Sequence, residues 1–341
     1  MQSWEWGEFK AALGWRVERV VLEREGKIVA GAQVLLRSLP WLPFNIAYIP
    51  KGPVADLTDR EAIGQLLTAV HQAARRYRAI FLRIEPSAID DDSVHNVLRD
   101  SGFQSTAQTN QPRSTLVLDL TGGEPALWAN MRRTTKKLIR RARRDGVEIV
   151  EGDTRDLDAF YQTIAATSET KGFPIHDKEF YEQAWHTFKA TDSVKLMLAR
   201  YQGQVVAAKM IVVYGDKSMH LWGGTRRRGR DTRASYLLQW ESIKWAMNRG
   251  CRCCDLWGIP DQVGELLQTG QELPQDQRGG LWGVYNFKRG FGGEIEYYVG
   301  AYDYAYKSLL YRLGRMLLAR QSTLDVASHW LERLSGRTPS G

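Results

Sequence analysis

The sequence lacks the features of an exported or disulfide-stabilised protein. It has only three cysteines, Cys251, Cys253 and Cys254, within a span of four residues. No zinc ligand pattern has this spacing, and neighbouring residues of a strand point to opposite faces, so we interpret these thiols as reduced packing residues. The chain starts without an apolar signal segment, and no run of about 18 apolar residues occurs in it. We therefore expect a cytoplasmic protein without a membrane span.

Groups for metal binding or nucleophilic catalysis are also scarce. The six histidines show no ligand spacing, and no Ser/His/Asp or Cys/His arrangement emerges. We expect no metal and no bound cofactor. Positive charge is abundant, because 47 lysines and arginines face 39 acidic residues and give a net charge of +8. This balance favours an anionic partner such as a nucleic acid, a nucleotide-linked substrate or an acidic membrane surface.

The order of strand-like and helix-like segments predicts two similar halves. A chain of 341 residues fits two domains. In the first half, a β-branched hairpin at 16–39 precedes an amphipathic helix at 60–78 and buried strands at 79–86 and 114–120. After residue 146 a similar series follows, with strands at 147–152 and 194–215, a helix at 232–250 and a strand at 251–259. The pattern predicts an α/β (α+β) protein with two tandem domains, each a mixed twisted sheet flanked by helices.

The expected division places residues 1–146 in the first domain and residues 147–302 in the second. Residues 125–146 are expected to form one basic helix where the domains join. A basic amphipathic helix at 303–320 is expected to pack back on the first domain, and its alternative is a peripheral contact with the inner leaflet of the membrane. The polar segment 261–280 reads as an exposed loop, and residues 321–341 as a C-terminal tail.

Five segments in this order resemble the FemABX peptidyltransferase family. They are YIPKGPV (48–54), RRTTKKLIRRARRDGV (132–147), GGTRRRGRDTRASYLLQWESIKWA (223–246), DLWGIP (255–260) and GLWGVYNFKRGFGGE (280–294). The resemblance implies two tandem GNAT-like domains with a substrate cleft between them, here without the long helical arm of some members. It also implies an aminoacyltransferase that moves an amino acid from aminoacyl-tRNA to a stem-peptide amine of a peptidoglycan precursor, lipid II or UDP-MurNAc-pentapeptide, and so builds an interpeptide bridge.

The resemblance places the family's catalytic lysine at Lys288, between Phe287 and Phe291. Attack of an amine on an ester creates an oxyanion, and a cation in a dry cleft stabilises such a charge by about 3 kcal/mol. We expect Phe287 and Phe291 to exclude water and hold the ammonium, and the following glycines to let the backbone approach a bulky substrate. From the residues alone, the alternative is a tight turn with a solvated lysine.

Lys51 and Arg230 match positions where the family contacts the precursor's diphosphate. The alternative for each is an exposed loop cation. For Arg230, nearby arginines could also take its place in a shifted alignment; they are Arg226, Arg227, Arg228 and Arg233. Asp119 resembles a cleft aspartate of the family, but a strand-terminal aspartate also commonly caps the chain, and the general base is left open.

A dense basic run is expected to bind the acceptor arm of tRNA, with a solvated helix face as the alternative. Its members are Arg132, Arg133, Lys136, Lys137, Arg140 and Arg141. The loop Arg226-x-x-Gly229-x-Asp231 keeps only the first half of the pyrophosphate loop of acetyl-CoA-dependent enzymes, and Asp231 would repel a pyrophosphate. Two other hypotheses stay open: an acyl-CoA-dependent GNAT-type N-acyltransferase on a small amine, and a protein that only binds nucleic acid.

Overall fold

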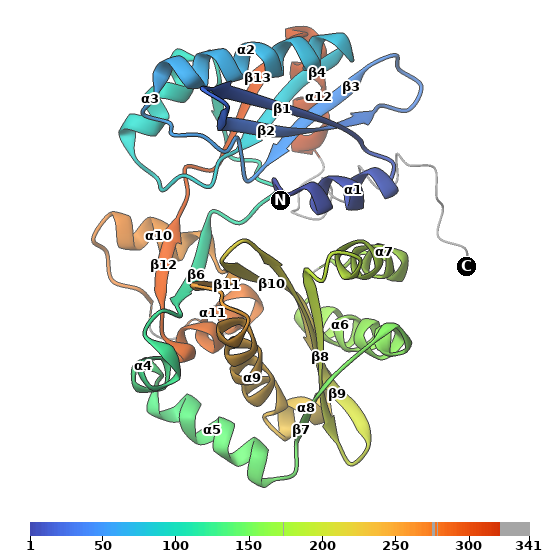
Figure 1. Ribbon diagram of the computed structural model, residues 1–341, viewed down its shortest axis with the longest axis vertical. Coiled ribbons are helices and arrows are strands. Elements are labelled where there is room, and N and C mark those ends of the chain that lie inside the picture. The colour runs from blue at the N-terminus through green and yellow to red at the C-terminus, as the bar shows by residue number, and fades with distance from the viewer. Residues whose placement is uncertain (173, 275–276, 278, 321–341) are drawn as a thin grey trace. The chain divides into compact units, whose positions relative to one another are not determined.

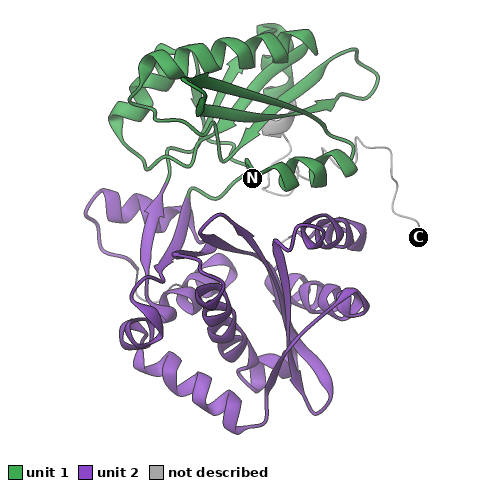
Figure 2. Ribbon diagram, in the orientation of Figure 1, with its two compact units in different colours: residues 1–113, 298–341 green, residues 114–297 purple. Residues whose placement is uncertain are grey.

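The chain folds into two compact units, shown in Figure 2. The computed structural model describes residues 1–172, 174–274, 277 and 279–320, so the predicted tail 321–341 lies outside the described residues. Unit 1 contains residues 1–113 and resumes at residue 298, while unit 2 contains residues 114–297. This division differs from the one expected at residue 146, because the strand that begins at Ser114 pairs within the sheet of unit 2.

The sheet of unit 1 has six strands in the order β1-β2-β3-β4-β13-β5. Neighbouring strands are antiparallel except β3 and β4, which are parallel. The predicted hairpin turns at Glu25 and Gly26, which have φ angles of 52° and 75°. The strands are β1 (Arg16–Arg24), β2 (Lys27–Ser38), β3 (Asn45–Pro50), β4 (Ala79–Glu85), β5 (Gln104–Thr106) and β13 (Ala301–Ala305).

Four helices belong to unit 1, namely α1 (Trp4–Ala12), α2 (Arg60–Arg76), α3 (Asp92–Asp100) and α12 (Ser308–Arg320). Helix α2 packs on β1, β2 and β4 through buried residues at helical spacing, among them Ile63, Leu66 and Val70. Helix α12 contacts β4 and begins later than the predicted helix 303–320. The residues before it form β13 instead, because Tyr302 is 1% exposed and its strand pairs with both β4 and β5.

The sheet of unit 2 has seven strands in the order β12-β6-β11-β10-β9-β8-β7. Only β10 and β11 are parallel; the other neighbouring strands are antiparallel. Figure 1 shows helix α9 on one face of this sheet and helices α6 and α7 on the other. The strands are β6 (Ser114–Asp119), β7 (Glu148–Glu151), β8 (Val194–Tyr201), β9 (Gln204–Tyr214), β10 (Lys217–Thr225), β11 (Cys253–Gly258) and β12 (Glu294–Tyr297).

The helices of unit 2 differ from the predicted ones in three places. The predicted helix 125–146 is two helices, because Met131 is extended and buried and the N–H of Arg132 donates to the carbonyl of Gly290 at 3.0 Å. The expected loop at 261–280 starts with a helix, and the arginine-rich loop after β10 contains a short one. The helices are α4 (Gly123–Asn130), α5 (Arg133–Arg144), α6 (Leu157–Lys171), α7 (Lys178–Lys189), α8 (Arg227–Asp231), α9 (Ala234–Asn248), α10 (Asp261–Gln268) and α11 (Gly280–Lys288), with 3₁₀ turns η1 (Thr154–Asp156) and η2 (Arg289–Phe291).

The two sheets share one strand plan, which confirms the predicted pair of tandem domains with mixed sheets. In each unit, antiparallel strands lead into one parallel pair, β3 with β4 in unit 1 and β10 with β11 in unit 2. Helices connect the strands of each pair, α2 in unit 1 and α8 and α9 in unit 2. An antiparallel strand from elsewhere in the chain then extends each sheet, β13 beside β4 and β6 beside β11. Among the described residues, no helix combines the length and apolar character that a bilayer crossing requires.

Candidate active site

Strand β11 leaves the regular ladder of the unit 2 sheet before it ends. Its parallel pairing joins residues 253–255 to residues 217–219 of β10 and then stops, although both strands continue. On its other side, the pairing with β6 has a register irregularity between Asp255 and Gly258. Trp257 lies here with a φ of +68°, a conformation that bulky residues seldom adopt. We call residues 255–258 the β11 bulge.

The carboxylate of Asp255 holds the β11 bulge in place. It accepts hydrogen bonds from the backbone N–H of Trp257 at 2.8 Å and from the hydroxyl of Thr115, and it forms an ion pair with Lys217 at 3.2 Å. Asp255 is only 3% exposed, and a buried carboxylate needs such partners. These bonds offset the left-handed conformation of Trp257, which costs about 1–2 kcal/mol for an L residue.

Lys288 donates hydrogen bonds to two backbone carbonyls of the β11 bulge. It is the last residue of α11, and its ammonium nitrogen Nζ lies 3.0 Å from the carbonyl oxygen of Trp257 and 2.7 Å from that of Gly258. The residue as a whole is partly exposed, while protein atoms surround its ammonium and desolvate it. The structure therefore does not show the solvated lysine that the residue pattern alone favours. An ammonium group has three N–H donors, so one remains after these two bonds.

The surroundings of Lys288 make its charge sensitive to pH. Burial, together with the nearby cation of Lys209, lowers the pKa of Lys288 to about 7, although the carboxylate of Asp255 acts in the opposite direction. An exposed lysine has a pKa near 10.4. About half of the Lys288 side chains are therefore neutral at pH 7. Perturbations of this kind concentrate at functional sites.

A second buried lysine, Lys209, is not among the site residues predicted from the sequence. It extends from β9, and its ammonium donates to Oε1 of Gln239 on α9 and lies 3.4 Å from Nδ1 of His220 on β10. Burial lowers the pKa of Lys209 to about 8. The sequence does carry a signal for this residue, because a single lysine interrupts the apolar strand VVAAKMIVV.

His220 and Cys254 complete this cluster as neutral groups. The Nε2 amide of Gln239 lies 2.8 Å from Nδ1 of His220, and Nε2 of His220 lies 3.2 Å from Sγ of Cys254. Burial and the cations of Lys209 and Lys288 hold the pKa of His220 well below its usual value, so the ring accepts the amide hydrogen. Burial raises the pKa of Cys254 to about 12, and its sulfur stays a thiol. We call Lys209, His220, Gln239, Cys254 and Lys288 the lysine cluster.

Aromatic rings lie beside Lys288, but they do not share one role. The ring of Phe287 meets those of Tyr236 and Phe291 edge-on, with centroid distances of 5.0 and 5.3 Å. Phe291 is 1% exposed and belongs to the hydrophobic core of unit 2. Phe291 therefore presents little surface to solvent, and its role in excluding water or contacting the substrate stays a prediction. Phe287 and Tyr236 are only partly buried.

The glycines that follow Lys288 serve close packing within the fold. A Cβ at Gly293 would lie 2.5 Å from the carbonyl oxygen of Val117 on β6, and the φ of Gly293 is +91°. A Cβ at Gly290 would lie 2.3 Å from the hydroxyl of Thr135 on α5. Close packing therefore requires glycine at these two positions, and the approach of a bulky substrate to this segment stays a prediction.

Asp119 lies away from Lys288 on the same sheet. Asp119 pairs with Cys253 at the start of β11, whereas Lys288 binds Gly258 at its end. At about 3.3 Å per residue, these points are roughly 16 Å apart along the strand. The exposed carboxylate of Asp119 accepts hydrogen bonds from the N–H and the hydroxyl of Thr121, which lower its pKa. These are the bonds of a capping residue, and a role of Asp119 in the site stays a prediction.

Arg230 lies in α8, directly after β10, and its guanidinium donates to the carbonyl of Thr225 at 3.1 Å. Gly229 beside it permits a close approach, since a Cβ there would lie 2.3 Å from the carbonyl oxygen of Val206. The neighbouring arginines are also engaged, because Arg226 donates to Gln162, Arg228 to Gln202 and Arg233 to the carbonyl of Arg230. Arg227 is the exposed member of this group for which the described residues provide no hydrogen bond.

Lys51 belongs to unit 1 and directly follows β3. Its φ is +49°, its Nζ donates to the carbonyl of Pro112 at 3.2 Å, and it lies 3.9 Å from the ring centroid of Tyr298. In the shared strand plan β3 corresponds to β10, since each is the first strand of its parallel pair. Lys51 and Arg230 therefore follow equivalent strands in the two units.

The basic helix α5 has one buried face and one charged face. Thr135, Ile139 and Ala142 are buried at helical spacing, and the helix packs on α9. Lys136 is half-buried and donates to the carbonyl of Ala129, and Arg141 pairs with Asp145. The other predicted tRNA contacts are exposed, and none of them forms an ion pair within the described part of the chain; they are Arg132, Arg133, Lys137 and Arg140.

Comparisons with known proteins find relatives that match most of the chain. A family model of the FemAB family matches residues 1–97, and one of the acetyltransferase (GNAT) domain matches residues 129–266. The chain is 28% identical over 285 residues to the UDP-N-acetylmuramoylpentapeptide-lysine N(6)-alanyltransferase of Weissella viridescens, covering 77% of this chain and 83% of that protein. It is 21% identical over 391 residues to the lipid II:glycine glycyltransferase of Staphylococcus aureus (strain MRSA252), covering 92% and 89%.

Solved structures show the same fold. The crystal structure of FemX superposes with a TM-score of 0.80 at 20% identity and covers 92% of this chain and 93% of that one. A tandem GNAT protein from the clavulanic acid biosynthesis pathway superposes with a TM-score of 0.50 at 14% identity and covers 85% and 83%. The duplicated plan of two mixed sheets is thus the tandem GNAT architecture.

Proposed function

We propose that this chain moves an amino acid from aminoacyl-tRNA to the stem-peptide amine of a peptidoglycan precursor. The proposal builds on its membership of the FemAB family and on its assignment as an acyltransferase. The names of two relatives support the acceptor, since one acts on UDP-N-acetylmuramoylpentapeptide and the other on lipid II. The acceptor of this chain is accordingly a muramyl pentapeptide in a nucleotide-linked or lipid-linked form. Because charged tRNA is made in the cytoplasm, the proposed reaction takes place there.

One observation carries the proposal: the ammonium of Lys288 is enclosed and holds two backbone carbonyls, with one N–H left for a ligand. In the proposed step, the acceptor amine attacks the ester carbon, a C–N bond forms, and the carbonyl oxygen becomes an oxyanion. The remaining N–H of Lys288 stabilises that oxyanion. The C–O bond to the tRNA 3′ oxygen then breaks, and the proton lost by the amine balances the new 3′ hydroxyl.

The carbonyls of Trp257 and Gly258 position Lys288 for this role. They fix two donors of a flexible side chain, so the third donor has a defined direction before the substrate binds. Phe287 and Tyr236 cover the neighbouring surface and limit the access of water. Asp255 acts indirectly, since it holds the β11 bulge that presents both carbonyls.

Lys51 and Arg230 are proposed to bind the precursor's phosphates. Their places support this, because each lies in the connection that follows the first strand of the parallel pair in its unit. The exposed cations of α5 are proposed to contact the tRNA acceptor arm, where binding weakens with salt as phosphates regain counterions. Arg132, Arg133 and Lys137 have no carboxylate partner within the described residues that would compete with a phosphate.

An acyl-CoA donor is the second candidate, and the match to an acetyltransferase domain over residues 129–266 favours it. Asp231, which lies exposed at the end of α8, stands against it because a carboxylate there would repel a pyrophosphate. Thermal-shift titration separates the two donors. Stabilisation by coenzyme A, and none by UDP-MurNAc-pentapeptide, would favour the acyl-CoA enzyme.

The proposed function is tested by incubating the protein with a pool of charged tRNA and each acceptor form, followed by mass spectrometry of the stem peptide. We expect an acceptor mass increased by one or more amino-acid residues, with no product after deacylation of the tRNA. Product formation that needs an acyl-CoA and ignores charged tRNA would contradict the proposal. The same assay identifies the amino acid transferred.

A further inference from the structure

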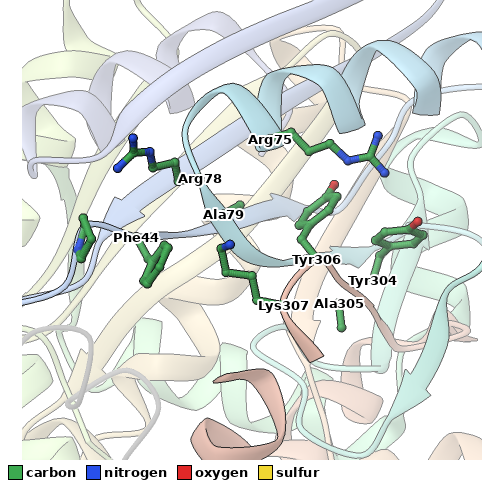
Figure 3. A pocket seen from close by; sticks show the side chains of 9 residues that line it. Phe44, Arg75, Arg78, Ala79, Tyr304, Ala305, Tyr306 and Lys307 are labelled. Atoms are coloured by element: carbon green, nitrogen blue, oxygen red, sulfur yellow. The ribbon is translucent and has the colours of Figure 1, made fainter. Parts of the chain in front are cut away.

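A hollow of about 510 Å³ opens on unit 1 (Figure 3). It is formed by the segment before β3, the end of α2 and the junction between β13 and α12. Three cationic side chains, Arg75, Arg78 and Lys307, surround it together with the ring of Phe44 and the rings of Tyr304 and Tyr306. None of the nine residues that line the hollow is acidic. Its chemistry is therefore cationic and aromatic.

The three cations of this hollow are not neutralised by nearby carboxylates of the described residues. Within the described residues, Arg75, Arg78 and Lys307 form no ion pair. They are exposed, and two of them lie over aromatic rings, Arg75 over Tyr306 at 5.5 Å and Lys307 over Phe44 at 5.0 Å. These stacking contacts hold the long side chains near the hollow without neutralising them. The hollow is thus suited to an anionic group.

Exposed apolar residues occur in sequence just before Phe44 and just after Lys307, two residues that line the hollow. Trp41 is 100% exposed and Leu42 is 48% exposed, and they precede Phe44 in a loop closed by a hydrogen bond from the N–H of Leu39 to the carbonyl of Phe44. On the other side, Leu309 and Leu313 are 75% and 48% exposed, one turn apart on α12. These apolar residues belong to the same two chain segments as Phe44 and Lys307, which line the hollow. Large exposed apolar residues that accompany cations are a feature of interaction sites.

We propose that this face of unit 1 docks on an anionic phospholipid membrane, with the hollow around Arg75, Arg78 and Lys307 holding a lipid phosphate and Trp41, Leu42, Leu309 and Leu313 entering the interface. Tryptophan and leucine favour the boundary between headgroups and acyl chains, and cations beside them meet the phosphates. The hollow and its apolar flanks below are called the docking face.

The apolar residues decide between a membrane and a nucleic acid as the partner. A phosphodiester backbone would meet the three cations equally well, but it offers no apolar region for Leu309 and Leu313. A bilayer offers both in one surface. The surface potential of anionic lipids attracts each nearby Lys or Arg by an amount that corresponds to about a fivefold change in affinity.

The test is co-sedimentation of the full-length protein with vesicles of phosphatidylglycerol mixed with phosphatidylcholine, and with vesicles of phosphatidylcholine alone. We expect binding to the anionic vesicles that falls with salt, and a loss on the order of 100-fold in the triple variant Arg75→Ser, Arg78→Ser, Lys307→Ser. Arg76→Ser is the matched control for Arg75→Ser, since Arg76 is exposed on the same helix but does not line the hollow. The Trp41→Ala, Leu42→Ser variant should also weaken binding with an unchanged melting temperature.

Equal vesicle binding by wild type and the triple variant would overturn the proposal, as would equal losses for Arg75→Ser and Arg76→Ser. A triple variant that loses tRNA or inorganic phosphate binding but keeps vesicle binding would assign the hollow to those ligands and also overturn it. Transfer to the soluble UDP-MurNAc-pentapeptide should be unchanged in all these variants. A failure of membrane docking is thereby distinguished from a failure of the proposed transferase function.

Discussion

The electrostatic coupling between Lys209 and Lys288 predicts a characteristic pH dependence of catalysis. With a pKa of about 7, Lys288 is half protonated at pH 7 and only about 1% protonated at pH 9. The acceptor amine behaves oppositely, because its reactive neutral form increases tenfold per pH unit below its pKa of about 10. If the cation of Lys288 is required, kcat/KM rises up to about pH 7 and is then level, since the two trends cancel.

The Lys209→Met variant tests this reasoning. Removal of the Lys209 cation raises the pKa of Lys288, and because burial is the larger cause of its low pKa, we expect the break in the profile to move upward by on the order of one pH unit. Asp255 remains and favours the charged form, while His220 and Cys254 stay neutral. The assay measures kcat/KM for transfer to UDP-MurNAc-pentapeptide from pH 6 to about pH 9 over short times, before the ester hydrolyses.

Lys195→Met is the matched control for this experiment. Lys195 lies on β8, next to β9, and pairs with Glu151, outside the lysine cluster. Its removal should leave the break near pH 7. A break that stays in place in Lys209→Met, or that moves to lower pH, would refute the coupling between the two lysines. A general loss of stability would change the height of the profile but not the position of its break.

Three further predictions concern the fold around the sites. Asp303→Ala should lower the free energy of unfolding by about 3–5 kcal/mol in urea denaturation, since it leaves the buried guanidinium of Arg83 without its carboxylate at 2.7 Å. Asp119→Ala should lower the melting temperature only slightly and leave kcat within about twofold, because its bonds to Thr121 cap the strand at an exposed position. A large fall in kcat would indicate that Asp119 takes part in the transfer. The free energy of unfolding should decrease as the pH falls below about 6.5, because burial lowers the pKa of His220 in the folded chain and only the unfolded chain takes up the proton. His220 contributes at most about 1.4 kcal/mol per pH unit to this decrease. The His220→Gln variant should therefore show a smaller decrease between denaturation curves at pH 7 and at pH 5.5.

The sequence predicts the local elements well and their long-range pairing less well. The hairpin of β1 and β2, helix α2 and the strands of unit 2 follow from the spacing of apolar residues and from turn residues such as Gly26. The boundary between the units does not, because it depends on the pairing of β6 with β11, more than 130 residues later. The break between α4 and α5 depends likewise on a bond from Arg132 to the distant Gly290.

The candidate site also depends on long-range contacts that the sequence pattern does not predict. The residue pattern around Lys288 favours a solvated side chain, and only the family resemblance indicates a catalytic lysine. The ammonium is enclosed because it binds the backbone carbonyls of Trp257 and Gly258 in β11, which lie far from Lys288 in the sequence. The single lysine in an apolar strand marks Lys209 as unusual, but its partners Gln239 and His220 are brought beside it only by tertiary packing. The distance between Asp119 and the end of β11 that Lys288 contacts depends on strand register, which no local pattern gives.

In the proposed reaction, the cation of Lys288 stabilises the oxyanion during aminoacyl transfer. Single-turnover transfer by Lys288→Met, compared with Arg289→Met, tests it most directly, because the control removes the adjacent cation of the same chain segment. We expect Lys288→Met to lose about 100- to 1000-fold in kcat while its affinity for UDP-MurNAc-pentapeptide is kept, and Arg289→Met to stay near wild type. A Lys288→Met enzyme that turns over at the wild-type rate would contradict it.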